Sequence, residues 1–148
     1  MRCVVQRVSQ AQVQVEDKTV GQIGPGLLAL VCVEEGDTQA QADQLCHKLQ
    51  GLRIFSDGEG KMNLDVRQTG GSLLLVSQFT LAGKLEKGFR PSFVSAARPE
   101  AAELLFDYCV ARLRHHYQLP VQTGRFRTHM EVSLVNDGPV TLVLEIKN

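Results

Sequence analysis

The sequence carries no net charge, because 16 lysine and arginine side chains balance 16 aspartate and glutamate side chains among its 148 residues. Such a chain has no overall field that attracts a polyanion, so any nucleic-acid binding has to be local. Long hydrophobic runs are missing too. No window approaches the roughly 18 apolar residues of a membrane span, and residues 1–7 lack the apolar core of a secretory signal. These absences predict a soluble, cytoplasmic protein with no membrane partner.

Paired metal ligands are also missing. The four cysteines, at positions 3, 32, 46 and 109, form no C-x-x-C pair, and three of them lie in apolar runs or on apolar helix faces. We interpret them as small buried hydrophobic residues, because a disulfide framework suits a shorter, secreted chain. No two of the four histidines have the spacing of metal ligands. The sequence therefore predicts no metal site and no cofactor.

Length and periodicity predict one domain, residues 1–148, with a single core. Apolar runs predict strands at 3–8, 12–15, 27–33, 52–55, 61–64, from residue 73, at 130–134 and at 142–146. The unbroken run at 27–33 belongs at the centre of a sheet. Helical spacing predicts one helix capped by Thr38 and another that begins at Pro99. We expect an α/β fold, a layered β/β/α sandwich in which two packed mixed sheets of about eight strands carry both helices on one face.

The most informative segment lies at 73–81, where an apolar run ends in the polar side chains Ser77, Gln78 and Thr80. Two interpretations are open. These side chains either supply a nucleophile or oxyanion donors, or they satisfy backbone groups where a strand leaves the core. A nucleophilic serine or threonine also needs a base, and no histidine is near in the sequence. The residue pattern alone favours the second interpretation.

A second informative segment, Asn136-Asp137-Gly138-Pro139-Val140-Thr141, separates the last two predicted strands. Its residue types are those that turns require, so we predict a hairpin turn. A proline at the start of a strand removes a ladder donor and exposes the preceding carbonyl. A cis Gly138–Pro139 bond, which costs an X-Pro pair little, would aim the carbonyls of Gly138 and Pro139 in nearly the same direction. Paired carbonyls of this kind can hold an ammonium group.

Residues 82–98 show no periodicity and contain the cationic side chains Lys84, Lys87, Arg90 and Arg98. We predict a long basic loop, and long loops in compact domains are often functional.

Together these segments resemble the signature motifs of the D-aminoacyl-tRNA deacylases, the D-tyrosyl-tRNA(Tyr) deacylase family. The first motif is Ser77-Gln78-Phe79-Thr80-Leu81 and the second is the segment at 136–141. The similarity continues through 1–8, 58–64, 87–93 and 122–124, so it covers essentially the whole chain in order. Two ordered motifs coincide by chance far less often than one. The sequence departs from the family before Met130, where small residues and an aspartate are usual and this chain has Arg127-Thr128-His129.

The resemblance implies a homodimer in which the Gly138–Pro139 turn of one subunit enters the pocket of the other. The implied substrate is an amino acid esterified to the terminal adenosine at the 3′ acceptor end of tRNA. D-amino acids, and glycine mischarged on tRNA(Ala), would be released while L-amino acids are rejected. The implied site residues are Ser77, Gln78, Phe79 and Thr80 around the adenosine and ester, Phe89 near the base, and Arg7 in support of the Gly138–Pro139 turn.

An aminoacyl ester is already activated, so its hydrolysis needs little beyond a placed water and donors for the oxyanion, here backbone N–H groups near Phe79 and Thr80. The resemblance implies that the tRNA 2′-OH orients that water, and we expect Lys84, Lys87 and Arg90 to contact phosphates. Two other classes stay open. A hydrolase with a threonine or cysteine nucleophile would form a covalent intermediate, whereas a non-catalytic module that binds RNA ends would protect aminoacyl-tRNA.

Overall fold

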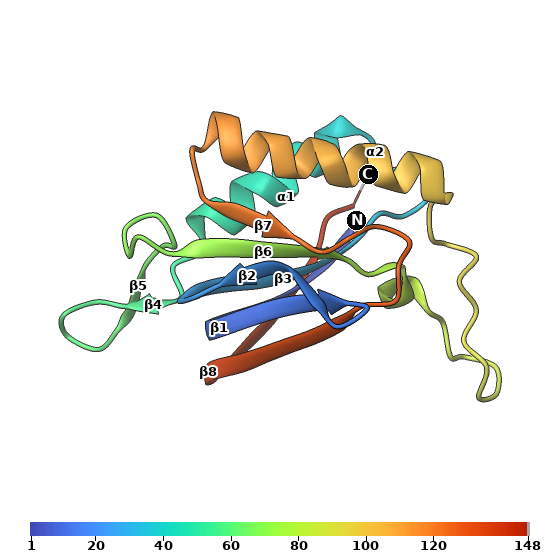
Figure 1. Cartoon of the computed structure of the whole chain (residues 1–148). Helices are drawn as coiled ribbons and strands as arrows, with labels where there is room; N and C mark the ends of the chain where they lie inside the picture. The colour runs from blue at the N-terminus through green and yellow to red at the C-terminus, as the bar shows by residue number, and fades with distance from the viewer. Residues whose placement is uncertain (148) are drawn as a thin grey trace.

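The computed structural model describes residues 1–147, and a six-stranded mixed sheet is its central element (Figure 1). The path of the sheet is β2–β1–β3–β6–β7, and β8 pairs with β1. The strands are β1 (Arg2–Val15), β2 (Lys18–Ile23), β3 (Gly26–Cys32), β6 (Ser72–Ser77), β7 (Val121–Thr123) and β8 (Glu131–Glu145). The pairs β3–β6 and β6–β7 are parallel, and the others are antiparallel.

Two helices cover one face of this sheet (Figure 1). Parallel strands need crossover connections, and α1 (Gln39–Gly51) lies between β3 and β6, whereas α2 (Pro99–Ala111) and the π-helical turn η2 (Arg112–His116) lie between β6 and β7. Thr38 starts α1 in a capping box with Gln41, and Pro99 stands in the first turn of α2, so both predicted helix starts are confirmed. No helix within residues 1–147 is long and apolar enough to cross a membrane.

The parallel strands at the centre of the sheet, β3 and β6, are buried on both faces. On β6, Leu73 and Leu75 belong to the cluster beneath the helices, whereas Leu74 and Val76 belong to a second cluster on the opposite face. This division follows from the alternation of side chains along a strand. β3 divides in the same way, with Leu27 in the first cluster and Leu28 in the second. The prediction of a central strand at 27–33 is therefore confirmed.

The sheet curls until it is nearly a barrel. Residues 2–8 of β1 pair with β3, and residues 11–15 pair with β2. Because β1 changes its partner along its length, β2 lies next to β7, and we call this contact the β2–β7 seam. At this seam Gly21 approaches the backbone of Thr123 closely, and a Cβ built on Gly21 would lie 2.3 Å from the Thr123 carbonyl oxygen. The two packed sheets that the sequence predicts are not found. The structure has one curled sheet and a separate hairpin of β4 (Phe55–Ser56) and β5 (Met62–Leu64).

The strand boundaries also differ from the prediction, although eight strands are described in residues 1–147. The segments predicted at 3–8 and 12–15 form one strand, β1, and those at 130–134 and 142–146 form one strand, β8. These two strands pair with each other over almost their whole length, so the ladder continues across the breaks in apolar alternation. The pattern predicts neither β2 nor β7. β7 is only three residues long, too short to show a period.

We predict that Gly21→Ala lowers the free energy of unfolding by about 1–3 kcal/mol, because the new methyl group has to displace backbone at the β2–β7 seam. Gly24→Ala is the matched control, since nothing lies within 4 Å of a Cβ built there. Urea unfolding of both variants measures the difference. Equal stability of the two would show that the seam is not tightly packed.

Candidate active site

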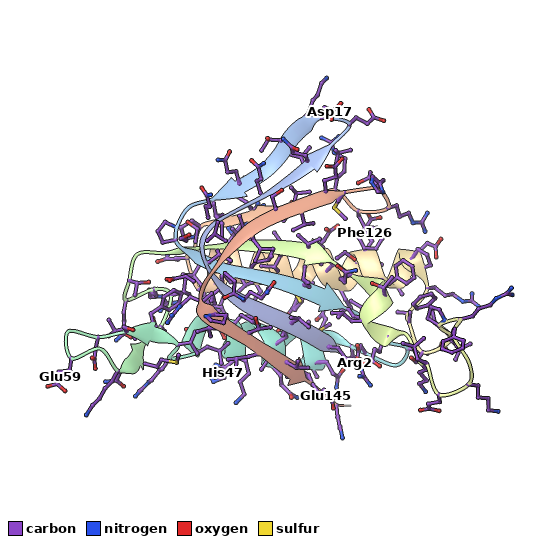
Figure 2. All side chains as sticks on the ribbon, turned by 90° about the horizontal axis from the view of Figure 1, so that it is seen from below. Arg2, Asp17, His47, Glu59, Phe126 and Glu145 are labelled. Carbon is purple, nitrogen blue, oxygen red and sulfur yellow. The ribbon has the colours of Figure 1, made fainter. Side chains whose placement is uncertain are left out.

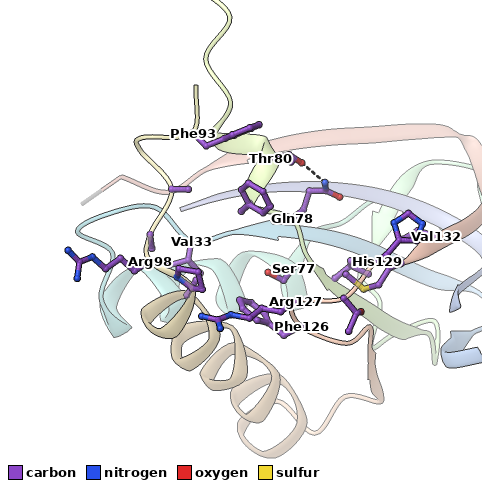
Figure 3. Close-up of a pocket in the computed structure, with 18 residues that line it drawn as sticks. Val33, Ser77, Gln78, Thr80, Phe93, Arg98, Phe126, Arg127, His129 and Val132 are labelled. Carbon is purple, nitrogen blue, oxygen red and sulfur yellow. Dashed lines mark hydrogen bonds between the residues drawn. The ribbon is translucent and has the colours of Figure 1, made fainter. Parts of the chain in front are cut away.

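The polar end of β6 forms part of the wall of a pocket of about 740 Å³ (Figure 3). Ser77 is the last residue of β6, and Phe79 and Thr80 begin the 3₁₀ turn η1 (Phe79–Ala82). All of these residues, and Gln78 between them, line the pocket. Four of the predicted site residues therefore lie together, in a cavity of the size that ligand sites usually have.

Parallel pairing with β3 sets the direction of the chain beyond Ser77. The Gln78 amide donates to the Val31 carbonyl at 2.8 Å, which continues the ladder by one step. The Cys32 thiol then donates to the Phe79 carbonyl at 3.6 Å. Because C=O and N–H point in opposite directions across a trans peptide, a Phe79 carbonyl held against β3 turns the Thr80 amide to the other side.

The amides of Phe79 and Thr80 stand at the start of η1, ahead of its first backbone hydrogen bond. That bond is donated by the Leu81 amide to the Gln78 carbonyl at 3.3 Å. The Thr80 hydroxyl accepts a hydrogen bond from Nε2 of Gln78 (Figure 3). Its partner is thus an amide, which cannot act as a general base. The geometry offers backbone donors to a ligand rather than an activated hydroxyl.

The opposite wall comes from α2 and from the connection between β7 and β8. Phe126, Arg127, Thr128 and His129 all line the pocket, so the stretch where the sequence departs from the family lies in the site itself. Phe126 packs on Phe106 of α2, with ring centroids 6.3 Å apart. Sequence reasoning did not include this stretch among the site residues. The departure before Met130 was the available signal.

Gly138 and Pro139 do not line this pocket. Pairing of β1 with β8 stops at Gln6 with Thr141 and resumes at Val8 with Asn136, so residues 137–140 bulge out opposite a single residue of β1. The predicted hairpin turn is wrong, because both flanks pair with the same strand in one direction. The Gly138–Pro139 bond is cis.

Side chains from β1 and from the two ends of the bulge hold it in place. Arg7 donates from Nε to the Asp137 carbonyl at 2.9 Å and from Nη1 to the Ile54 carbonyl at 2.7 Å. Asn136 links the two ends of the bulge. Its Oδ1 accepts a hydrogen bond from the Val140 amide at 2.8 Å, and its Nδ2 donates one to Oγ1 of Thr141 at 2.8 Å. The sequence includes Asn136 and Thr141 in the second motif but does not predict this structural role for them.

Glycine is required inside the bulge. Gly138 has φ +145°, and a Cβ there would lie 2.8 Å from Cγ2 of Val140.

Phe89 does not line the pocket either. It is fully exposed on the loop at 83–98, which extends from the body of the molecule (Figure 1). Backbone pairing of Lys84 with Ser92 closes the base of this loop, and Phe93 packs edge-on against Phe79 with centroids 5.2 Å apart. The loop therefore reaches the pocket through Phe93 and through its last residues, Ala96, Ala97 and Arg98.

Among the described residues, the charged side chains of the lining are Arg98 and Arg127, and no Asp or Glu lines the pocket. His129 lines it as well. Within residues 1–147, no group of three or more His, Cys, Asp and Glu side chains is arranged to hold a metal ion.

Comparison with known proteins identifies the family. The model of the family described as D-Tyr-tRNA(Tyr) deacylase matches residues 4–145. The chain belongs to this family. The D-aminoacyl-tRNA deacylase of Klebsiella pneumoniae (strain 342) is 56% identical over 146 residues, 99% of this chain and 100% of the relative. The deacylase of Stenotrophomonas maltophilia (strain K279a) is 58% identical over 144 residues, 97% of this chain and 99% of the relative.

Solved structures show the same fold. One named c-Myc DNA Unwinding Element Binding Protein is 36% identical, with a TM-score of 0.94 and full coverage of both chains. Another, described as a probable eukaryotic D-amino acid tRNA deacylase, has a TM-score of 0.74 over 97% of each chain, and at 19% identity it is similar in fold alone. The deacylase family consists of hydrolases that act on an ester bond, and the pocket at the end of β6 is the candidate active site of this member.

Burial raises the pKa of the Cys32 thiol from 9.0 to about 11, with a smaller contribution from the charge of Glu34. Because this pKa is higher in the folded than in the unfolded state, the stability it contributes is complete below about pH 9 and is lost as the pH rises toward 11. We predict that the free energy of unfolding falls less steeply between about pH 9 and about pH 10.5 in Cys32→Ser than in the unaltered protein. Urea titrations at fixed pH measure this. Identical slopes would contradict a buried, protonated thiol.

Proposed function

We propose that the protein hydrolyses the ester bond of D-aminoacyl-tRNA, releasing the free D-amino acid and tRNA, and rejects the L-aminoacyl form. The observation that carries the proposal is the turn at Phe79 and Thr80, whose leading amides stand at a pocket large enough for a nucleoside ester, in a chain of the deacylase family. Glycine mischarged on tRNA(Ala) would be a further substrate. The role is chiral proofreading in the cytoplasm.

The proposed chemistry depends on positioning. The ester carbonyl lies against the amides of Phe79 and Thr80, which stabilise the oxyanion as it develops. The 2′-OH of the terminal adenosine orients the attacking water, so the protein needs no charged catalyst. Cys32 contributes indirectly, because its hydrogen bond to the Phe79 carbonyl fixes the plane of the donor peptide.

A hydrolase with a cysteine or threonine nucleophile fits the site less well. The raised pKa of Cys32, about 11, keeps its thiol protonated at neutral pH, and the thiolate is the reactive form. Thr80 is hydrogen-bonded to an amide rather than to a base. Ser77 is half-buried at the end of β6, and none of its described hydrogen bonds involves a base.

We also propose that the active form is a homodimer in which Gly138 and Pro139 complete the partner's pocket. Two observations support this. The Gly138–Pro139 bulge is exposed but does not line the pocket of its own chain. β8 leaves apolar side chains in solvent, with Val143 68% exposed and Leu142 and Val135 also exposed. Exposed apolar residues along a strand that pairs on one edge mark a surface suited to a second chain.

Chiral selection then follows from where the substrate ammonium is held. Carbonyl groups of Gly138 and Pro139 from the partner would accept hydrogen bonds from the ammonium and fix the α-carbon. With that point fixed, a change of chirality swings the side chain from open space into protein backbone. Selection by steric exclusion of this kind needs no contact specific to one D-amino acid.

Incubation with D-tyrosyl-tRNA and L-tyrosyl-tRNA tests the function. Release of tyrosine from the D-form alone is the expected result. Equal release from both forms would remove the chiral role, and a covalent intermediate seen by mass spectrometry of quenched reactions would favour the nucleophilic hydrolase. Protection of both esters would favour a module that only binds RNA ends.

We predict that Thr80→Ala retains most of the single-turnover rate on D-tyrosyl-tRNA, because the proposed donors are backbone groups that survive the substitution. A tRNA that ends in 2′-deoxyadenosine should react about 10² to 10³ times more slowly, the usual loss when one transition-state hydrogen bond is removed. If Thr80→Ala abolished turnover while the deoxy substrate reacted normally, a threonine nucleophile would be the better mechanism.

We predict that Val143→Lys converts the dimer to a monomer and abolishes deacylation, because it places a charge in the proposed apolar interface. Val94→Lys is the matched control, since Val94 is at least as exposed, at 77%, but lies on the loop at 83–98. Light scattering gives the mass of each variant. A monomer with full activity would exclude a site completed by the partner's Gly138 and Pro139.

A further inference from the structure

The pocket is locally cationic in a protein that has no net charge. Arg98 and Arg127 lie beside the start of α2 and His129 lies across the pocket from them (Figure 3). No carboxylate is part of the described lining. Arg98 and Arg127 are two positive charges at one wall, so this wall attracts anions even though the whole molecule has no net charge.

Arg127 has hydrogen-bond donors that could bind an anion. Its Nη2 donates to Oε1 of Glu100 at 2.8 Å, and this is one of five N–H donors of the guanidinium. The side chains of Arg127 and Glu100 are 53% and 76% exposed, so the ion pair is screened by water and holds Arg127 weakly. A phosphate oxygen can therefore accept a hydrogen bond from Arg127 beside Glu100, or it can replace Glu100 as the partner of Arg127.

The proposed substrate carries opposite charges at its two ends. Its amino acid has a cationic ammonium group, and the phosphodiester on the 5′ side of the terminal adenosine is anionic. The arginine wall repels the first and attracts the second, so the nucleotide backbone leaves the pocket past α2. Lys84, Lys87 and Arg90, which the sequence suggests as phosphate contacts, do not line the pocket.

We propose that Arg127, with Arg98 beside it, binds the phosphodiester that joins the last two nucleotides of the acceptor end, and that Glu100 competes with that phosphate for Arg127. This assignment rests on the proposed deacylase function. It gives the two members of one ion pair opposite effects on the substrate: Arg127 strengthens binding and Glu100 weakens it. A purely structural ion pair would give both substitutions the same sign.

The experiment compares two substrates that differ in phosphate. D-tyrosyl-tRNA contains the phosphodiester, whereas D-tyrosyl-adenosine, the same ester on a free nucleoside, does not. Arg127→Gln removes the charge without a new demand on the backbone, because glutamine and arginine both carry a Cβ and have a similar cost at the positive φ of residue 127, +59°. Lys61→Gln and Glu59→Gln are matched controls, since Lys61 and Glu59 form an exposed ion pair on the β4–β5 hairpin, outside the pocket.

For Arg127→Gln we expect kcat/KM on D-tyrosyl-tRNA to fall about 10-fold, the order of magnitude of a lost charge-assisted hydrogen bond, with no change on D-tyrosyl-adenosine. Glu100→Gln should raise kcat/KM on the tRNA substrate about 2- to 5-fold, because it removes a competitor of the strength of a surface ion pair. The slope of log kcat/KM against log salt should become shallower by about 0.7 for Arg127→Gln, as for one lost contact to a single strand. The two control substitutions should change none of these values.

Equal losses on both substrates for Arg127→Gln, or a loss for Glu100→Gln, would overturn the assignment. Binding of uncharged tRNA, measured with the same variants, provides a readout that does not need turnover. If the unaltered protein hydrolyses neither D-ester, the proposed function fails, and the binding measurement still decides the role of Arg127. Unchanged binding of uncharged tRNA by Arg127→Gln would reject the phosphate site on its own.

Discussion

The parallel ladder between β3 and β6 is the interaction on which the rest of the structure depends. It places one apolar face under the helices and the other inside the curled sheet, so it joins both hydrophobic clusters. The same ladder continues one residue past the end of β6, where the Gln78 amide donates a hydrogen bond to the Val31 carbonyl. A fully buried strand pair has little freedom to shift, because a register slip would move every side chain to the opposite face. The turn at Phe79 and Thr80 follows this strand pair directly, so its position is held by the same ladder.

A second ladder, between β1 and β8, serves the other half of the proposed site. It continues on both sides of the bulge at 137–140, with a second register shift between Val8 and Gln10, and the bulge is held by Arg7 of β1 and by Asn136 at its start. A functional segment is thereby carried by a long strand rather than by a loose loop. The structure separates the two signature motifs within one chain, and this separation is the physical reason for proposing that a second chain completes the site.

Charge is distributed in keeping with a protein that reads only the end of a nucleic acid. Numerous phosphate contacts would make affinity strongly dependent on salt and would bind any RNA. The protein has no net charge, but Arg98 and Arg127 line the pocket, so anions are attracted locally at the place where the proposed function puts the ester. Under the proposed function, specificity for the acceptor end would come from the shape of the pocket and from a small number of local contacts.

The sequence by itself determined the two helices, the buried central strands and the polar end of β6. Each of these depends on local signals, such as the Thr38 cap, the Pro99 start and the continuous apolar runs, which report burial and propensity without reference to distant residues. The two motifs also led to the family, because their order along the chain is visible without a structure.

Only the tertiary structure decided the rest. The single curled sheet and the bulge in place of a hairpin turn depend on the pairing of β1 with β8, which are more than a hundred residues apart in the sequence. The periodicity of a sequence does not indicate which strands pair. The same holds for the pocket wall at Phe126, Arg127 and His129. These residues line the same pocket as Ser77 because α2 and the β7–β8 connection are packed around the end of β6. The chemistry of neighbouring residues does not encode such a relation between distant segments.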